Sequence, residues 1–141
     1  MLTLVQTRIK PIFDHVGGAA NVREAMGQPI HRSSVAYVVP VSESPVGNSR
    51  DVDIGQPLQE SVITFGVVIG IKSINDSTGE KALIQLEQLR TALRNSLYGW
   101  KPSSDFEPVL LSKSDLVGFA TQGLWWIDRF ITNTWYQGVN G

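Results

Sequence analysis

Residues 59–97 constrain the fold more than any other part of the chain. Branched and aromatic residues alternate along the first half of this stretch, at Ile63, Phe65, Val67, Ile69 and Ile71. Side chains on a strand point to opposite faces with a period of two, so these residues form one continuous apolar row. The sequence therefore predicts a long strand with one strongly apolar face.

A helix is predicted directly after this strand. Turn-forming residues 75–79 come first, and a stripe of mostly apolar residues then recurs at three- and four-residue steps, at Ala82, Leu83, Leu86, Leu89, Arg90, Leu93 and Leu97. This spacing places the stripe along one side of a helix. Helices and sheets are stable only when their apolar faces bury each other, so we expect this helix to cover the strand.

Further elements are predicted on both sides of this unit. Two short helices are expected over residues 2–10 and 19–26, and Pro11 ends the first because proline lacks an amide donor. The remaining strands are predicted over residues 34–40, 106–111 and 124–135. The expected fold is α+β, with a mainly antiparallel sheet and helices packed on one of its faces.

The connection between the first two predicted strands is long. Residues 41–58 contain two prolines, several glycine and asparagine turn formers, and few large apolar residues. Long loops in compact domains are usually functional or disordered, so the alternatives are an interaction loop and a solvated linker. The residues predicted to make contacts are Val46, Asn48, Arg50, Asp51 and Asp53.

Length and composition exclude several classes of protein. The 141 residues fit a single domain, residues 1–141, and the absence of cysteine rules out disulfides and thiolate metal sites. A net charge of -1 lacks the basic excess expected of a protein that binds nucleic acid sequence-specifically. The longest apolar run, residues 62–71, is half the length needed to cross a bilayer. Without a secretory signal, the chain is expected to work where it is made.

The sequence offers no constellation of catalytic residues. Asp14, His15 and Glu24 lie near one another along the chain, but no nucleophile accompanies them, and we expect Asp14 and His15 to end a helix in solvent. His31 is too far along the chain from His15 to make a good metal site. No glycine-rich phosphate loop is present. The prediction is a protein without catalytic residues, cofactor or metal.

Both faces of the last predicted strand are apolar. Trp126 and Phe130 lie on one face, and four more apolar residues lie on the other. A strand of this kind is covered on both sides, here by a second layer or by a neighbouring subunit. A stacking platform for bases is the weaker alternative, because it would need a basic groove. The predicted subunit interface is Trp125, Ile127, Arg129, Ile131 and Trp135.

A series of short motifs resembles one known family. These motifs are Arg8-Ile9-Lys10, Gly18-Ala19-Ala20, the strand from Val35 to Pro40, Phe65-Gly66-Val67-Val68, the turn Asp76-Ser77-Thr78-Gly79, Leu89-Arg90, and Trp126, Phe130 and Thr132 in the closing strand. The most distinctive motif is Gly99-Trp100-Lys101-Pro102. Together they resemble the tail terminator proteins of long-tailed bacteriophages, in particular the branch found in Mu-like prophages. The likeness runs over nearly the whole chain, and Pro11 and the short C-terminal tail are small departures.

The resemblance implies a structural virion protein of the tail and neck, assembled in the bacterial host cytoplasm. Such proteins form a ring, typically a hexamer, that caps the head-proximal end of the tail tube and stops its polymerisation. They also present a surface to the head connector, and DNA is free to pass through the ring. A closed ring needs a heterologous interface, which the last strand and the small residues of the central strand are expected to supply.

Two alternatives remain open from the sequence. One is another phage neck component, such as a head-completion or stopper protein, which has a similar size and also forms rings. The other is a small α+β ligand-binding domain or enzyme. That alternative requires a polar pocket with converging titratable groups, and the sequence offers no cluster to build one.

Overall fold

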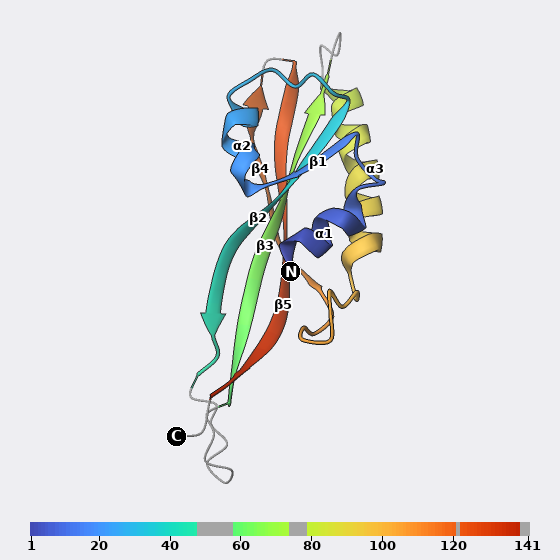
Figure 1. The fold of residues 1–141 in the computed structure, drawn as a ribbon. Helices are drawn as coiled ribbons and strands as arrows, with labels where there is room; N and C mark the ends of the chain where they lie inside the picture. Colours follow the sequence, from blue (N-terminus) through green and yellow to red (C-terminus); the bar gives the residue numbers. More distant parts are fainter. Residues whose placement is uncertain (48–57, 74–78, 121, 139–141) are drawn as a thin grey trace.

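One sheet organises the chain. The structure is a computed structural model that describes residues 1–47, 58–73, 79–120 and 122–138. Its elements are α1 (Leu2–Ile9), β1 (His15–Gly18), α2 (Ala19–Met26), β2 (Ser34–Pro45), β3 (Leu58–Lys72), α3 (Glu80–Leu97), β4 (Leu110–Ala120) and β5 (Gly123–Gln137). The strands lie in the order β1-β2-β3-β5-β4 (Figure 1). β1 runs parallel to β2, and the other neighbouring pairs are antiparallel. The predicted α+β class and mainly antiparallel sheet are confirmed.

α1 and α3 cover one face of the sheet. The apolar row of β3, with Phe65 fully buried, packs beneath the α3 stripe as predicted. In α3 the buried residues are Ala82, Leu86, Leu93 and Leu97, whereas Leu83 is 58% exposed. α3 ends where the sequence predicts, because Gly99 adopts φ +80°, a conformation that glycine reaches at little cost.

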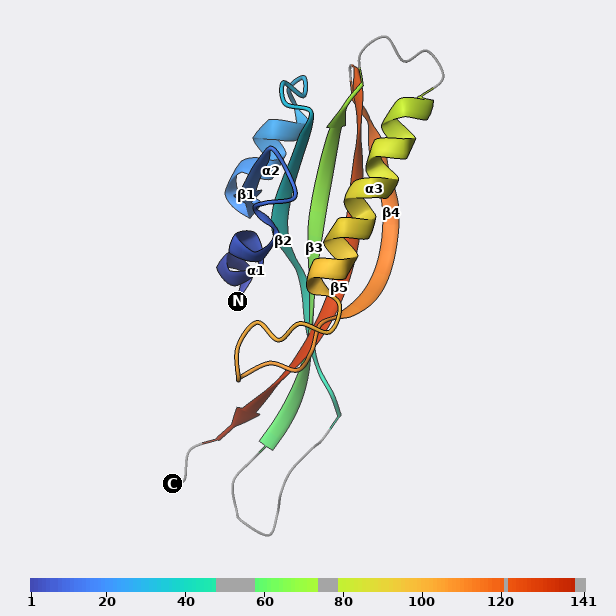
Figure 2. The ribbon, with the colours of Figure 1, turned by 90° about the vertical axis from the view of Figure 1, so that its right-hand side faces the viewer.

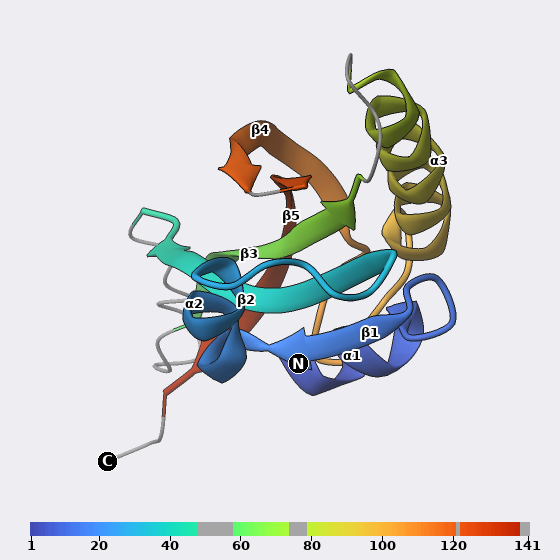
Figure 3. The ribbon, with the colours of Figure 1, turned by 90° about the horizontal axis from the view of Figure 1, so that it is seen from above.

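α2 lies on the opposite face, which differs from the prediction of helices on one face only. Its residues Val22, Ala25 and Met26 pack against a second buried cluster that includes Tyr37 and Trp125. Figure 3 shows the strands between α2 and α3. The apolar side of α2 was predictable from the sequence, but the sheet face that it covers depends on the direction in which the chain leaves β1 at Gly18.

The outer strands differ most from the prediction. No strand was predicted at β1, and β4 continues to Ala120, well beyond the strand predicted over residues 106–111. β2 continues to Pro45 through a register shift after Pro40, so the predicted long loop is shorter than residues 41–58. This loop also follows the second strand of the chain, whereas it was predicted to follow the first. Pro40 and Pro45 are tolerated in β2 because β1 pairs only with residues 35–38 of β2 and leaves the rest of that edge open.

Three strands project beyond the helices as an arm. We define the arm as residues 41–45 of β2, 58–62 of β3 and 133–137 of β5, which pair side by side. Figures 1 and 2 show this end of the sheet extending past α1, α2 and α3. The connection before β4 covers part of the arm, because Thr134 donates a hydrogen bond to the carbonyl oxygen of Asp105 at 2.8 Å, whereas Trp135 and Tyr136 of β5 are exposed.

Candidate functional site

The arm is held together by hydrogen bonds between side chains of its three strands. The Glu43 carboxylate on β2 accepts hydrogen bonds from the Ser61 hydroxyl at 3.1 Å and from the Tyr136 hydroxyl at 2.8 Å. Glu60 accepts a further one from the Asn133 side chain. The hydrogen bond to the Glu43 carboxylate, together with its negative charge, raises the pKa of Tyr136 above 10.0. These contacts tie β2 and β5 to β3 at the end of the sheet.

The predicted contact loop begins at the tip of this arm. Val46 is 41% exposed, and its backbone N–H donates to the carbonyl oxygen of Glu60 at 2.8 Å. Its side chain therefore lies on an ordered part of the chain and is partly open to solvent. The other predicted contact residues lie outside the described residues: Asn48, Arg50, Asp51 and Asp53.

The predicted subunit interface on β5 divides into a covered part and an accessible part. Trp125 and Ile127 are only 3% and 9% exposed, because α2 and neighbouring strands of the same chain pack around them. Arg129 is half-buried and pairs with Asp115 of β4 at 2.6 Å. Beyond it, Ile131 is half-buried and Trp135 is 47% exposed. The interface stays a prediction, and its accessible surface lies toward the arm.

The small residues of β3 make room for β5 side chains of the same chain. A Cβ atom on Gly70 would lie 2.6 Å from the Trp125 ring, and one on Gly66 would lie 2.8 Å from the Ile127 side chain. The two glycines thus leave room for the side chains of Trp125 and Ile127 of β5 to pack against β3. This gives them a role within the fold, whereas the sequence pointed to a subunit interface.

The free edge of β4 carries the densest group of exposed apolar side chains in the described part of the chain. Five of its eleven residues are large and exposed: Leu110, Leu111, Leu116, Val117 and Phe119. Neighbouring strand residues point to opposite faces, so both faces of this edge are apolar. Exposed apolar edge strands favour pairing with another chain unless they are protected. This surface was not among the predicted contact residues.

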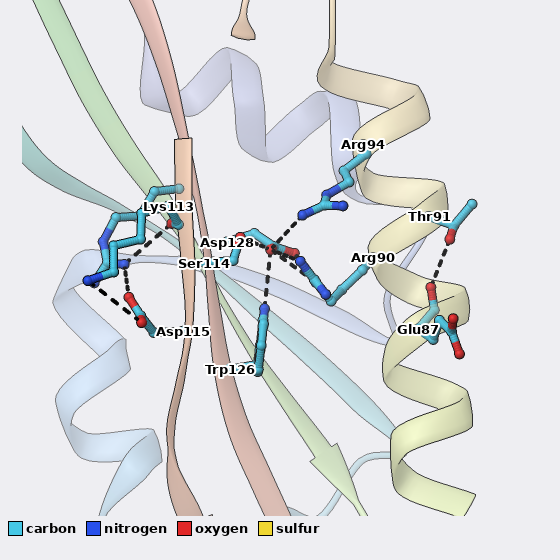
Figure 4. Close-up of polar contacts among 10 residues, drawn as sticks. Glu87, Arg90, Thr91, Arg94, Lys113, Ser114, Asp115, Trp126 and Asp128 are labelled. Atoms are coloured by element: carbon cyan, nitrogen blue, oxygen red, sulfur yellow. Dashed lines mark hydrogen bonds and ion pairs between the residues drawn. The ribbon is translucent and has the colours of Figure 1, made fainter. Parts of the chain in front are cut away.

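A buried carboxylate joins the helical layer to the sheet. Asp128 on β5 is 1% exposed and accepts hydrogen bonds from Arg90 Nε at 3.0 and 3.1 Å to its two oxygens. It also accepts from the Ser114 hydroxyl at 2.5 Å and the Trp126 indole N–H at 3.2 Å (Figure 4). The Arg90 guanidinium lies over the Trp126 ring, 4.6 Å from its centroid. The cluster therefore connects α3, β4 and β5.

This cluster was not predicted, although the sequence carries a signal for it. Arg90 was recognised within an otherwise apolar helix stripe, and Asp128 interrupts an apolar strand. A charged residue at a core position is seldom buried without a partner of opposite sign. Two such interruptions in elements predicted to pack together indicate an ion pair, which would also have fixed the register of α3 on the sheet.

A pocket of about 250 Å³ opens on the α2 side of the sheet, near the end remote from the arm. Its walls come from β1, β2, β5 and the connection after α2. Three aromatic rings line it one after another, with His15 edge-on to Tyr37 at 5.9 Å and Tyr37 6.3 Å from Trp125. The polar residues Gln28, His31 and Arg32 form its rim.

Two of the residues considered for catalysis, Asp14 and His15, lie at the start of β1. Asp14 accepts a hydrogen bond from the Ser33 hydroxyl, which lowers the pKa of its carboxyl group below 3.8, and so ties β1 to the start of β2. His15 begins β1, whereas the sequence placed it at a helix end. Among the described residues, no group of three histidine, cysteine, aspartate or glutamate side chains is placed to hold a metal ion. No helix in the described ranges is long and apolar enough to cross a membrane.

Similarity to a known family decides the assignment. A family model described as "Phage tail terminator protein" matches residues 4–137, which include every strand and most of α1. The chain belongs to the phage tail terminator family. No curated protein matched the chain.

Membership gives the chain a structural role in the phage tail. The family also implies contacts with tail and head components and favours a function without catalysis. For a tail terminator, the surfaces of interest are those that meet other proteins. The arm and the free edge of β4 are the strongest candidates, because both carry exposed apolar side chains.

Proposed function

We propose that this tail terminator caps the head-proximal end of the phage tail tube, stops tube polymerisation and forms the joining surface for the head connector. The match of a tail terminator family model to residues 4–137 carries this proposal. We further propose that the chain acts as one domain in a ring, typically of six copies. DNA passes through the ring, and assembly takes place in the host cytoplasm. The short motifs favour the Mu-like branch of the family.

The two edges of the sheet support assembly into a ring. β4 forms one edge, whereas β1 and the open part of β2 form the other, so a subunit presents two different surfaces to its neighbours. Contacts between different surfaces are heterologous, and they close into a ring when the rotation per subunit allows it. The accessible residues Arg129, Ile131 and Trp135 extend such a contact toward the arm.

The arm and the loop at its tip are the surfaces that we assign to the tail tube. Tube contacts at this end would leave the opposite end of the sheet free for the head connector. Trp135 and Tyr136 are 47% and 57% exposed on the arm, and large aromatic side chains dominate binding energy at many interfaces.

Electron microscopy of phage lacking the protein tests the proposed function. Overlong tails are expected, because nothing would stop tube growth. Tails of normal length detached from heads would contradict the proposal and support a head-completion or stopper role. The mass of the purified protein tests the ring separately: a closed oligomer, or a monomer that closes when concentrated, is expected.

The loop assignment has its own test. Replacing residues 48–56 with a short Gly-Ser linker leaves β2 and β3 intact and should abolish termination while the protein stays folded. Trp135→Ala on the arm should weaken tube binding, and Tyr98→Ala, which truncates a 59% exposed aromatic residue outside the arm, should not. Normal tails from the loop variant would refute the tube assignment.

A further inference from the structure

Phe119 is the most exposed large apolar side chain in the described part of the chain. It is 80% exposed near the end of β4, on the free edge of the sheet. The neighbouring residues 116–123 carry no charge, so a partner that covers the ring need not desolvate a charged group beside it along the chain. An isolated exposed apolar residue is ordinary, but here four other exposed apolar residues lie on the same edge strand.

The pocket has the composition expected of a site for an aromatic side chain. Its walls are the rings of His15, Tyr37 and Trp125, and aromatic rings pack favourably edge-to-face. Arg32 at the rim can lie over an incoming ring as a cation–π partner. The volume of about 250 Å³ exceeds the roughly 150 Å³ of a cavity that admits benzene. The Trp125 indole N–H is buried without a hydrogen-bond partner among the described residues, so this wall is incompletely satisfied.

The sheet register places Phe119 and the pocket at the same level along the strands, toward opposite edges of the sheet. Phe119 pairs with Leu124, Leu124 with Ile71, and Ile71 with Ser34. The next residue of β2, Val35, lines the pocket and pairs with His15 of β1. The proposed tube and connector contacts lie at opposite ends of the strands, so the axis of the proposed ring runs along the strands and rotation about it keeps equal heights. Phe119 of one copy therefore meets the pocket level of the next.

We propose that Phe119 of one copy inserts into the pocket lined by Tyr37 and Trp125 of the neighbouring copy. The proposal rests on the proposed ring and names the contact that closes it. The other strongly exposed aromatic residues fit less well. Trp135 and Tyr136 lie at the far end of the sheet, where they pair with Glu60 and Gln59. Tyr98 follows α3 on the face that the pocket does not share.

Disulfide trapping tests this contact directly, because the chain contains no cysteine. Phe119→Cys and Gln28→Cys would be prepared as separate proteins, and both are expected to keep the fold because both positions are exposed. Oxidation of the mixture should give a disulfide-linked heterodimer. A mixture of Tyr98→Cys with Gln28→Cys, in which Tyr98 is another exposed aromatic position, should stay unlinked.

Three outcomes would overturn the proposal. A self-linked dimer of Phe119→Cys alone would indicate a two-fold contact between β4 edges. Failure to link in a protein whose mass shows a ring would reject this contact and leave the ring intact. A protein that stays monomeric at every concentration and on tails would reject the ring as well.

Truncating the Phe119 ring measures the contribution of the contact. Burying a phenylalanine side chain stabilises a contact enough that Phe119→Ala should weaken association about 10- to 100-fold, as measured by sedimentation across a concentration series. Phe119→Leu should retain part of the affinity, and Tyr98→Ala should leave it unchanged. Equal association of Phe119→Ala and the unmodified protein would contradict the proposal.

Discussion

Asp128 is a buried charged residue on which contacts from three elements converge. It accepts hydrogen bonds from an arginine, a serine and a tryptophan while being 1% exposed. Removing one partner of a buried ion pair leaves the other charge unpaired and typically costs about 3–5 kcal/mol. Arg90 remains partly exposed, at 22% of its side chain, and water can reach it when the carboxylate is lost. The cost should therefore fall at the lower end of this range.

Asp128→Ala should lower the free energy of unfolding by about 3 kcal/mol in urea titrations. Asp115→Ala is the matched control, because it removes the shorter ion pair with Arg129 at 2.6 Å on the solvated edge strand. Exposed ion pairs contribute about 0–1 kcal/mol, so this change should be small. Equal losses from the two substitutions would show that burial does not decide the strength of these pairs.

At the scale of elements, the sequence predicted those strands and helices whose apolar residues recur at a regular spacing. β3 and α3 were predictable because their apolar residues recur without interruption and because the two elements bury each other. β1 was missed because four residues, two of them glycine, are too few to show alternation. β4 was misread because register shifts after Leu111 and Leu116 break the period of two and because its residues are largely exposed.

The candidate contact surfaces were less predictable than the fold. The doubly apolar pattern of β5 was consistent with a subunit interface, yet α2 of the same chain covers Trp125 and Ile127. Periodicity shows that a face is covered but not which element covers it. The pocket could not be predicted from the sequence, because His15, Tyr37 and Trp125 come together only through strand pairing.

The arm should show its own dependence on pH. The hydrogen bond to Glu43 raises the pKa of Tyr136, so the neutral hydroxyl is favoured in the folded state. The stabilisation is present below pH 10.0 and is lost as the pH rises through the raised pKa. The contact between Tyr136 and Glu43 should therefore be lost at alkaline pH.

An ultraviolet absorbance titration of the phenolate, compared with Tyr136→Phe, would measure this pKa. Glu43→Gln should move it back toward 10.0, because the substitution removes the negative charge beside the hydroxyl. Tyr37, whose pKa is raised by burial at the other end of β2, serves as an internal reference and should not respond. A pKa of Tyr136 unchanged by Glu43→Gln would contradict an effect of the Glu43 charge, since the glutamine oxygen can still accept the hydrogen bond.

At the scale of the whole molecule, the two sides of the sheet differ in a way suited to assembly. One edge is a single long strand with apolar residues on both faces, and the other combines the short β1 with an open stretch of β2. The helical face is closed by α1, α3 and the Asp128 cluster. The centre of the sheet is therefore covered by helices, whereas its two edges are accessible.

The uninterrupted pairing of β3 with β5 limits where residues can be inserted into or deleted from the chain. Every residue from Leu58 to Lys72 has a partner in β5 with no register shift, whereas β2 and β4 contain shifts. Removing Arg129 would turn each following side chain of β5 to the wrong face and should abolish folding, as judged by circular dichroism. Removing Ser112, which lies within a β4 irregularity, should only lower the melting temperature. Insertions and deletions are thus expected to accumulate at the margins of the sheet while its two central strands keep their length.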